Sequence, residues 1–195
     1  MKIITLSPKY EIYRGIDEDF LSKKEELLKM EKINRDNMVD TKRNSLWMEI
    51  NAEVFRSIND EIKDSITKVT GTPFINYAEH YWIYTQTKGF NMEWMHRHHL
   101  VHPDSRSKVF TDYAFTYYIQ QPTNLKGDEG NIVFQDDRGV KHSFLPKEGE
   151  WFIFPADVLH TAIPTPECDI DRIVYAGSLC IDVQKQQEHI LKHRI

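Results

Sequence analysis

From about residue 73 onward, the chain is a succession of short runs rich in aromatic and β-branched residues. The runs are Tyr81–Tyr84, Ala114–Ile119, Asn131–Phe134, Trp151–Phe154 and Arg172–Tyr175. Turn-forming groups divide them, at Lys88–Gly89, Gly127–Gly130, Asp136–Gly139 and Lys147–Gly149. Many short strands with frequent turns are typical of a β-sandwich or barrel, the class that contains jelly rolls and cupins.

Two charged segments with helical spacing precede this β-rich part. In the first, an apolar stripe is formed by Phe20, Leu21, Leu27, Leu28, Met30 and Ile33. In the second, from about Ser45 to Thr70, apolar residues recur at four-residue steps: Leu46, Ile50, Val54, Ile58, Ile62 and Ile66. Asn44 or Ser45 is the candidate N-cap, and Gly71 followed by Pro73 is the candidate stop. We expect both helices to bury one face, and we assign them no chemistry.

Composition limits the partners and the compartment. The chain has 195 residues and a formal net charge of −5, with basic residues dispersed among acidic ones. No basic stripe that would neutralise nucleic-acid phosphates is evident, so nucleic-acid binding is disfavoured. The apolar runs are too short to cross a bilayer, and the first residues do not resemble a signal peptide. Cys168 and Cys180 stand outside any C-x-x-C motif, so a cytoplasmic setting is expected.

Four histidines fall within seven residues, at positions 96, 98, 99 and 102. On an extended strand, residues i and i+2 point to the same face, so His96 and His98 project together. Two converging imidazoles form half of a metal site. The alternative is a polar loop in which the histidines have no common role.

His160 and Arg172, further along the chain, help to decide between a metal site and a polar loop. His160 follows the aromatic strand Trp151–Phe154, at a place where several metalloenzyme families have their last metal ligand. Arg172 opens the last apolar strand, and a guanidinium that points into a core needs an anionic partner. That partner is Asp169, Asp171, another carboxylate of the chain, or the carboxylate of a ligand.

In this order, the motifs resemble those of the Fe(II)/2-oxoglutarate-dependent oxygenases, in particular the small members common in phage and marine bacterial genomes. The matching elements, over about residues 75 to 182, are Lys88-Gly89 leading to His96-Arg97-His98, Tyr117-Tyr118 followed by Pro122, Gly130–Phe134, Gly149–Pro164 and Arg172. The resemblance implies a mostly β fold, a double-stranded β-helix of jelly-roll type preceded by two amphipathic helices. The whole of 1–195 is then one domain, with a helical buttress at 1–72, the double-stranded β-helix at 73–183 and a polar tail at 184–195.

The resemblance also implies roles for individual residues. His96, His98 and His160 hold Fe(II), and Arg172 binds the distal carboxylate of 2-oxoglutarate with help from the Tyr117 hydroxyl. Decarboxylation of 2-oxoglutarate leaves succinate, and the reaction oxidises a C–H bond of a small-molecule or peptidyl substrate. The polar tail suggests a homodimer.

One departure from the family pattern affects the ligand set. Most such oxygenases have His-x-Asp, with two histidines and one carboxylate, whereas this chain has His98 at the third position. Either the site consists of three histidines, or Asp104 or Asp112 replaces one imidazole. The segment His99–Thr111 is longer than the family pattern and is expected to form a lid or a substrate-facing loop.

Two other functions are compatible with these residues. A cupin-type enzyme could use three histidines without 2-oxoglutarate, and Arg172 would then bind the substrate or be structural. A β-sandwich module could also bind a partner without catalysis, because the fold alone does not fix the activity.

Overall fold

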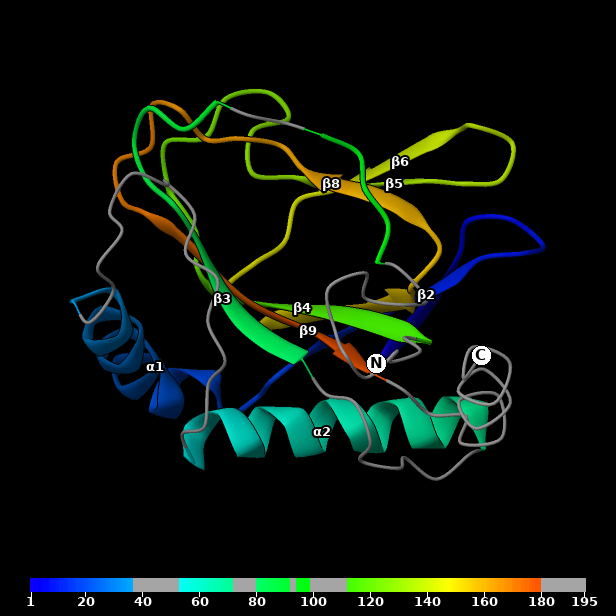
Figure 1. The fold of residues 1–195 in the computed structure, drawn as a ribbon, viewed down its shortest axis with the longest axis horizontal. Helices are drawn as coiled ribbons and strands as arrows, with labels where there is room; N and C mark the ends of the chain where they lie inside the picture. The colour runs from blue at the N-terminus through cyan, green and yellow to red at the C-terminus, as the bar shows by residue number, and fades with distance from the viewer. Residues whose placement is uncertain (37–52, 72–79, 92–93, 99–111, 180–195) are drawn as a thin grey trace, which may run out of the picture.

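Two antiparallel β-sheets of unequal size form the body of the molecule in this computed structural model, which describes residues 1–36, 53–71, 80–91, 94–98 and 112–179. The large sheet has the strand order β1 (Lys2–Thr5), β2 (Glu11–Ile16), β7 (Glu150–Pro155), β4 (Tyr113–Gln120), β9 (Arg172–Leu179) and β3 (His80–Gln86). The small sheet has the order β6 (Lys141–Phe144), β5 (Ile132–Gln135) and β8 (Leu159–Ala162). The small sheet lies over one face of the large one (Figure 1).

The five aromatic runs predicted to be strands coincide with β3, β4, β5, β7 and β9, so the prediction of a mostly β fold with flanking helices is confirmed. Along β4, consecutive side chains alternate between two cores. Ala114 and Tyr118 pack into the core between the sheets, whereas Phe115, Tyr117 and Ile119 pack toward the helices. Both faces of this strand are therefore apolar.

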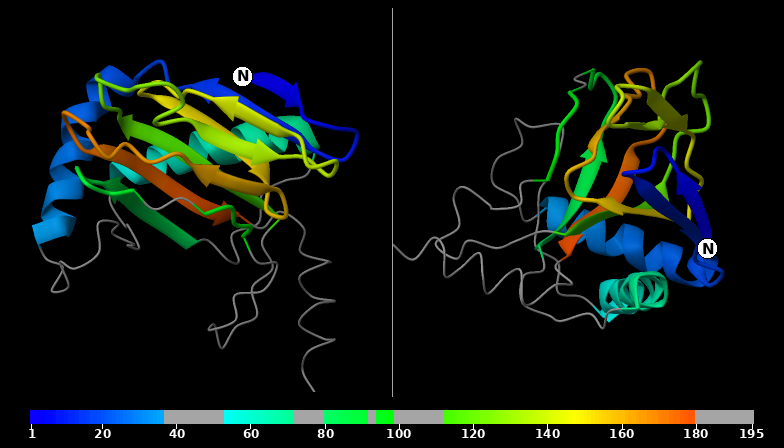
Figure 2. Two further views of the ribbon diagram at one scale, coloured as in Figure 1. Left: turned by 90° about the horizontal axis from the view of Figure 1, so that it is seen from above. Right: turned by 90° about the vertical axis from the view of Figure 1, so that its right-hand side faces the viewer.

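Helices α1 (Phe20–Asp36) and α2 (Glu53–Thr70) cover the outer face of the large sheet (Figures 1 and 2). Ile58, Ile62 and Ile66 of α2 are fully buried, as their four-residue spacing predicts. Gly71 ends α2 with a positive φ of 67°, and its N–H donates to Thr67 O at 2.9 Å. The candidate N-caps of this helix lie outside the described residues. Neither helix, among the residues described, combines the length and apolarity needed to span a membrane.

The apolar stripe predicted for α1 is wrong in part. Leu27 is fully buried, but Leu21 is 83% exposed and Ile33 is 42% exposed. The buried face instead includes Glu31, whose carboxylate accepts hydrogen bonds from Arg35 and from Thr85 of β3. A buried carboxylate is tolerable there because it is paired.

The prediction that residues 1–72 form only a helical buttress is also wrong. Strands β1 and β2 precede α1 and add a hairpin to the edge of the large sheet beside β7. β1 is short and three of its four residues are exposed, so it lacks the alternating pattern that marks a half-buried strand. The polar tail at 184–195, with the homodimer suggested for it, lies outside the described residues.

Candidate functional site

The main chain joins two of the predicted metal ligands directly. His96 and His160 form an antiparallel bridge in which His96 N donates to His160 O and His160 N donates to His96 O, both at 2.9 Å. The N–H of His98 donates to Ala156 O at 3.0 Å, which fixes the third residue separately. One ring nitrogen from each of the three histidines lies within 4.8 Å of the others. The structure therefore brings together the three histidines that the sequence singled out.

Burial favours the neutral imidazole at His96 and His160, which is the form that binds metals. Desolvation lowers the pKa of His96, and desolvation together with the neighbouring His98 and His96 lowers the pKa of His160 well below its usual value. His160 Nδ1 lies 3.1 Å from Val158 O. Because a carbonyl only accepts hydrogen bonds, the proton belongs on Nδ1 and the lone pair on Nε2. Such a backbone contact orients a ligand histidine.

The cluster contains no carboxylate from the described residues. Asp112, one of the two alternatives, precedes β4, where its N–H donates to Leu179 O and its carbonyl accepts from Ala156 N. It is not a member of the cluster. Asp104, like the expected lid around it, lies outside the described residues. Three neutral imidazoles suit Fe(II), Ni(II), Cu(II) or Zn(II), and they leave the full charge of the ion uncompensated by protein ligands.

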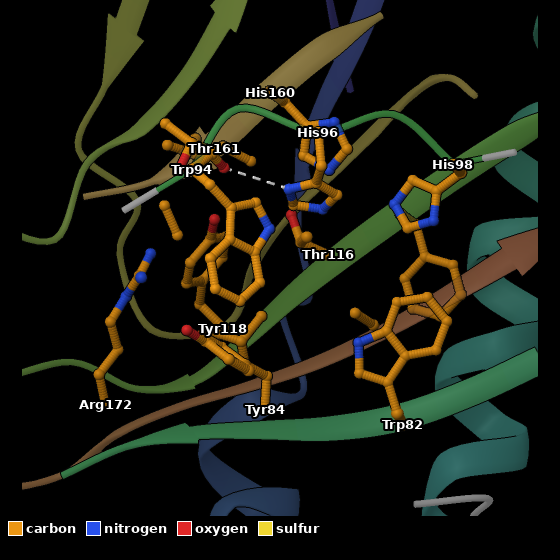
Figure 3. A pocket seen from close by; sticks show the side chains of 15 residues that line it. Trp82, Tyr84, Trp94, His96, His98, Thr116, Tyr118, His160, Thr161 and Arg172 are labelled. Carbon is orange, nitrogen blue, oxygen red and sulfur yellow. Dashed lines mark hydrogen bonds between the residues drawn. The ribbon is translucent and has the colours of Figure 1, made fainter. Parts of the chain in front are cut away.

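A cavity of about 170 Å³ lies between the two sheets beside the histidines. Figure 3 shows the three imidazoles on one side of it and Arg172 on the other. Its wall is largely aromatic and apolar, with contributions from Trp82, Tyr84, Trp94, Tyr118, Ile132 and Val174. The ring of Trp82 lies 5.6 Å from that of His98 between centroids, and Trp94 is 53% exposed. The cavity thus has the three histidines at one end and the buried Arg172 at the other.

Arg172 is fully buried, and three neutral oxygen atoms accept hydrogen bonds from it. Its Nε donates to Gln121 Oε1 at 3.1 Å, one Nη donates to Gln86 Oε1 at 3.3 Å, and the other donates to Gly130 O at 3.0 Å. Burial lowers the pKa of the guanidinium, although an arginine remains charged in proteins. Three of its five N–H groups are used in this way.

The two carboxylates nearest in sequence are engaged elsewhere. Asp171 pairs with Arg35 of α1 at 2.7 Å. Asp169 accepts hydrogen bonds from the backbone N–H and the hydroxyl of Thr123. Among the described residues, no carboxylate forms an ion pair with Arg172, so this part of the chain does not supply the anion that a buried guanidinium needs.

The role predicted for Tyr117 is wrong. Its hydroxyl donates to Asp17 Oδ2 at 2.9 Å, on the helix-facing side of β4, and it does not line the cavity. Its neighbour Tyr118 occupies the position instead, with Arg172 Cζ 5.4 Å from the centre of its ring. Adjacent strand residues face opposite sides, so the Tyr-Tyr pair offers one tyrosine to each core.

Glutamines 86 and 121 were not predicted as part of the site. They lie on β3 and just after β4, far from each other in the chain, and nothing in a single sequence connects them to Arg172. Thr116 was also missed. It shares the inward face of β4 with Tyr118, and its buried Oγ1 has no hydrogen-bond partner among the described residues.

A scan against protein-family models and a search of curated proteins each returned no match. Solved structures do match. A prolyl-4-hydroxylase from Pseudomonas putida superposes with a TM-score of 0.60 at 13% identity, covering 88% of this chain and 92% of that one. A Trichoplax adhaerens prolyl hydroxylase, in complex with a hypoxia inducible factor peptide fragment, gives 0.61 at 11%, covering 90% and 86%. HygX from Streptomyces hygroscopicus, with nickel and 2-oxoglutarate bound, gives 0.57 at 11%, covering 90% and 87%. The likeness shows the fold, a double-stranded β-helix as predicted.

Proposed function

We propose that this chain is an Fe(II)- and 2-oxoglutarate-dependent oxygenase that oxidises a C–H bond of a small-molecule or peptidyl substrate. One observation carries the proposal: three histidines, and an arginine that has no carboxylate partner among the described residues, face the same cavity from opposite sides. A ligand that has a metal-binding group and a distant carboxylate satisfies both ends at once. 2-Oxoglutarate is such a ligand, and HygX carries it together with a metal on the same fold.

Each residue has a distinct part. His96, His98 and His160 would hold Fe(II), which when bound with 2-oxoglutarate and oxygen supplies the oxidising chemistry. Arg172 would bind the distal carboxylate through a paired hydrogen bond. The largely apolar walls lower the local dielectric constant, which strengthens the electrostatic attraction between the guanidinium and a carboxylate.

Trp82 and Trp94 are the residues that we assign to the substrate. Trp94 lines the cavity near the histidines and is half exposed, so one side of its ring can contact a molecule that enters from solvent. A peptide segment, as bound by the Trichoplax neighbour, or an apolar small molecule would fit such a surface. Trp94→Ala should therefore leave the affinities for metal and 2-oxoglutarate within about twofold while changing which compounds stimulate 2-oxoglutarate consumption.

The test is an anaerobic titration with Fe(II) and 2-oxoglutarate that follows the weak visible charge-transfer band of the chelated cosubstrate. The parent should develop the band, His160→Ala should abolish it, and Arg172→Met should require at least tenfold more 2-oxoglutarate. His142→Ala is the matched control, because His142 lies in the same small sheet as His160 but contacts Asp136 and not the histidine cluster. It should behave as the parent does.

A second function is favoured by one feature of the site: among the residues that the structure describes, no carboxylate belongs to the histidine cluster. Three histidines on this fold also suit a cupin-type metalloenzyme that binds its substrate directly to the metal. If iron binds but no band forms at any 2-oxoglutarate concentration, this second function replaces the first. If neither Fe(II) nor Ni(II), Mn(II) or Zn(II) binds, both are refuted and a non-enzymatic binding module remains.

A further inference from the structure

The environment of Arg172 differs from that of three less buried arginines in the described part of the chain. Arg14 pairs with Glu150 at 2.7 Å, Arg35 pairs with Glu31 and Asp171 at 2.6 and 2.7 Å, and Arg138 pairs with Asp136 at 2.8 Å. Arg172 is more deeply buried than any of them, yet its side-chain partners are the neutral residues Gln86, Gln121 and Tyr118. Burying a cation with neutral partners alone is costly unless a ligand supplies the anion.

The two glutamines are held so that their oxygens, and not their nitrogens, face the guanidinium. Gln86 is fully buried and its Nε2 donates to Tyr84 Oη at 3.1 Å. Gln121 is 8% exposed and its Nε2 donates to Pro146 O at 3.3 Å. Since the guanidinium only donates hydrogen bonds and an amide has one donating and one accepting end, both Oε1 atoms face Arg172. Each glutamine therefore orients the guanidinium without neutralising it.

We propose that Gln86 and Gln121 are positioning residues that fix the fork of Arg172 while reserving its charge for the carboxylate of a ligand. This inference rests on the proposed function for the identity of that ligand, 2-oxoglutarate. A glutamate at either position has nearly the same shape, but it would form an internal ion pair and compete with the ligand carboxylate. The choice of amide over carboxylate then determines whether the cavity accepts an anion.

The test compares Gln121→Glu with Gln121→Met, a pair matched in size. Both variants lose the hydrogen bond to Pro146 O, and only the first adds a charge. In the anaerobic titration, Gln121→Glu should weaken 2-oxoglutarate binding by about 10- to 100-fold, as expected when a hydrogen bond to a charged group is lost. Gln121→Met should weaken it less than Gln121→Glu does, and both should bind Fe(II) within about twofold of the parent. Equal 2-oxoglutarate affinities for the two variants would overturn the proposal.

A second measurement needs no ligand. In the metal-free protein, Gln121→Glu should melt about 4 °C or more above Gln121→Met, because it gives a buried cation a partner. If Gln121→Glu melts at or below Gln121→Met, the charge of Arg172 is already compensated and the proposal fails. The pair Gln86→Glu and Gln86→Met should show the same order, which guards against a folding defect specific to position 121.

These results separate the inference from the proposed function. If the parent binds Fe(II) but not 2-oxoglutarate, the proposal that 2-oxoglutarate is the cosubstrate is refuted. The Tm values of the metal-free glutamate and methionine variants still decide whether the glutamines leave the charge of Arg172 without a counter-charge. A parent that binds 2-oxoglutarate while the glutamate variants bind it equally well refutes the inference alone.

Discussion

Replacing Tyr117 with phenylalanine separates the two faces of β4 experimentally. The change removes one hydroxyl, which donates to Asp17 Oδ2 at 2.9 Å, and leaves the buried ring in place. Asp17 keeps Lys23 Nζ at 2.8 Å and the backbone N–H of Asp19, so its carboxylate is not left unpaired. The loss is then that of one hydrogen bond to a charged group, about 1.5–3 kcal/mol in the free energy of unfolding.

For a domain of this length, that loss corresponds to a fall of roughly 3 to 12 °C in Tm. Thermal and urea unfolding of the metal-free protein measure it. The affinity for 2-oxoglutarate should remain within twofold of the parent, because Tyr117 faces the helices and not the cavity.

Tyr118→Phe is the matched control, since it removes the same hydroxyl from the neighbouring residue on the opposite face. The Tyr118 side chain contacts Arg172 through its ring and its hydroxyl, so we expect a change in 2-oxoglutarate affinity of severalfold. If Tyr117→Phe weakens 2-oxoglutarate binding and Tyr118→Phe does not, the assignment of the two faces is refuted.

Three further predictions concern stability. Gly15→Ala should lower the free energy of unfolding by about 1–3 kcal/mol in urea, because a Cβ there would lie 2.1 Å from the indole of Trp151; an unchanged midpoint would contradict this. Burial raises the pKa of Asp136, but hydrogen bonds from Arg138 and from the N–H of Val140 outweigh it and lower the pKa overall. Ionised Asp136 therefore stabilises the fold above its ordinary pKa of 3.8, and this stabilisation is lost as the pH falls below that value. In Asp136→Asn, the free energy of unfolding should consequently fall less steeply with decreasing pH than in the parent. An equally steep fall would refute the assignment. When the free metal concentration is about 100 times its Kd, removing the metal with a chelator should lower the Tm of the parent by roughly 5 to 11 °C and leave that of His160→Ala unchanged. Equal shifts in both proteins would mean that the metal binds elsewhere.

The histidine cluster could be predicted from the sequence because its geometry depends on simple rules. His96 and His98 share a face through their i, i+2 spacing, and His160 follows a strongly marked strand. Tyr117 was predicted to face the cofactor, although it faces the helices, because both faces of β4 are largely apolar. Phe115, Tyr117 and Ile119 lie on one side, and Ala114, Thr116 and Tyr118 lie on the other. The single threonine gives too little contrast in polarity to identify the cavity side.

The partners of Arg172 could not be found in this way. Gln86, Gln121 and Gly130 come from three separate segments, and only the pairing of β3 and β4 with β9 brings the two glutamines near the arginine. Short-range charge patterns pointed instead to Asp169 and Asp171. The hairpin of β1 and β2 was missed because its first strand is short and mostly exposed, and its place depends on the free edge of β7.

The bridge between His96 and His160 makes this protein a convenient scaffold for metal-site engineering. The spacing of these two donors is set by a pair of main-chain hydrogen bonds, which a side-chain substitution does not remove. Position 98 is attached independently, through Ala156. Aspartate, cysteine or glycine could therefore be introduced at position 98 to compare anionic, thiolate and vacant third ligands against a constant histidine pair.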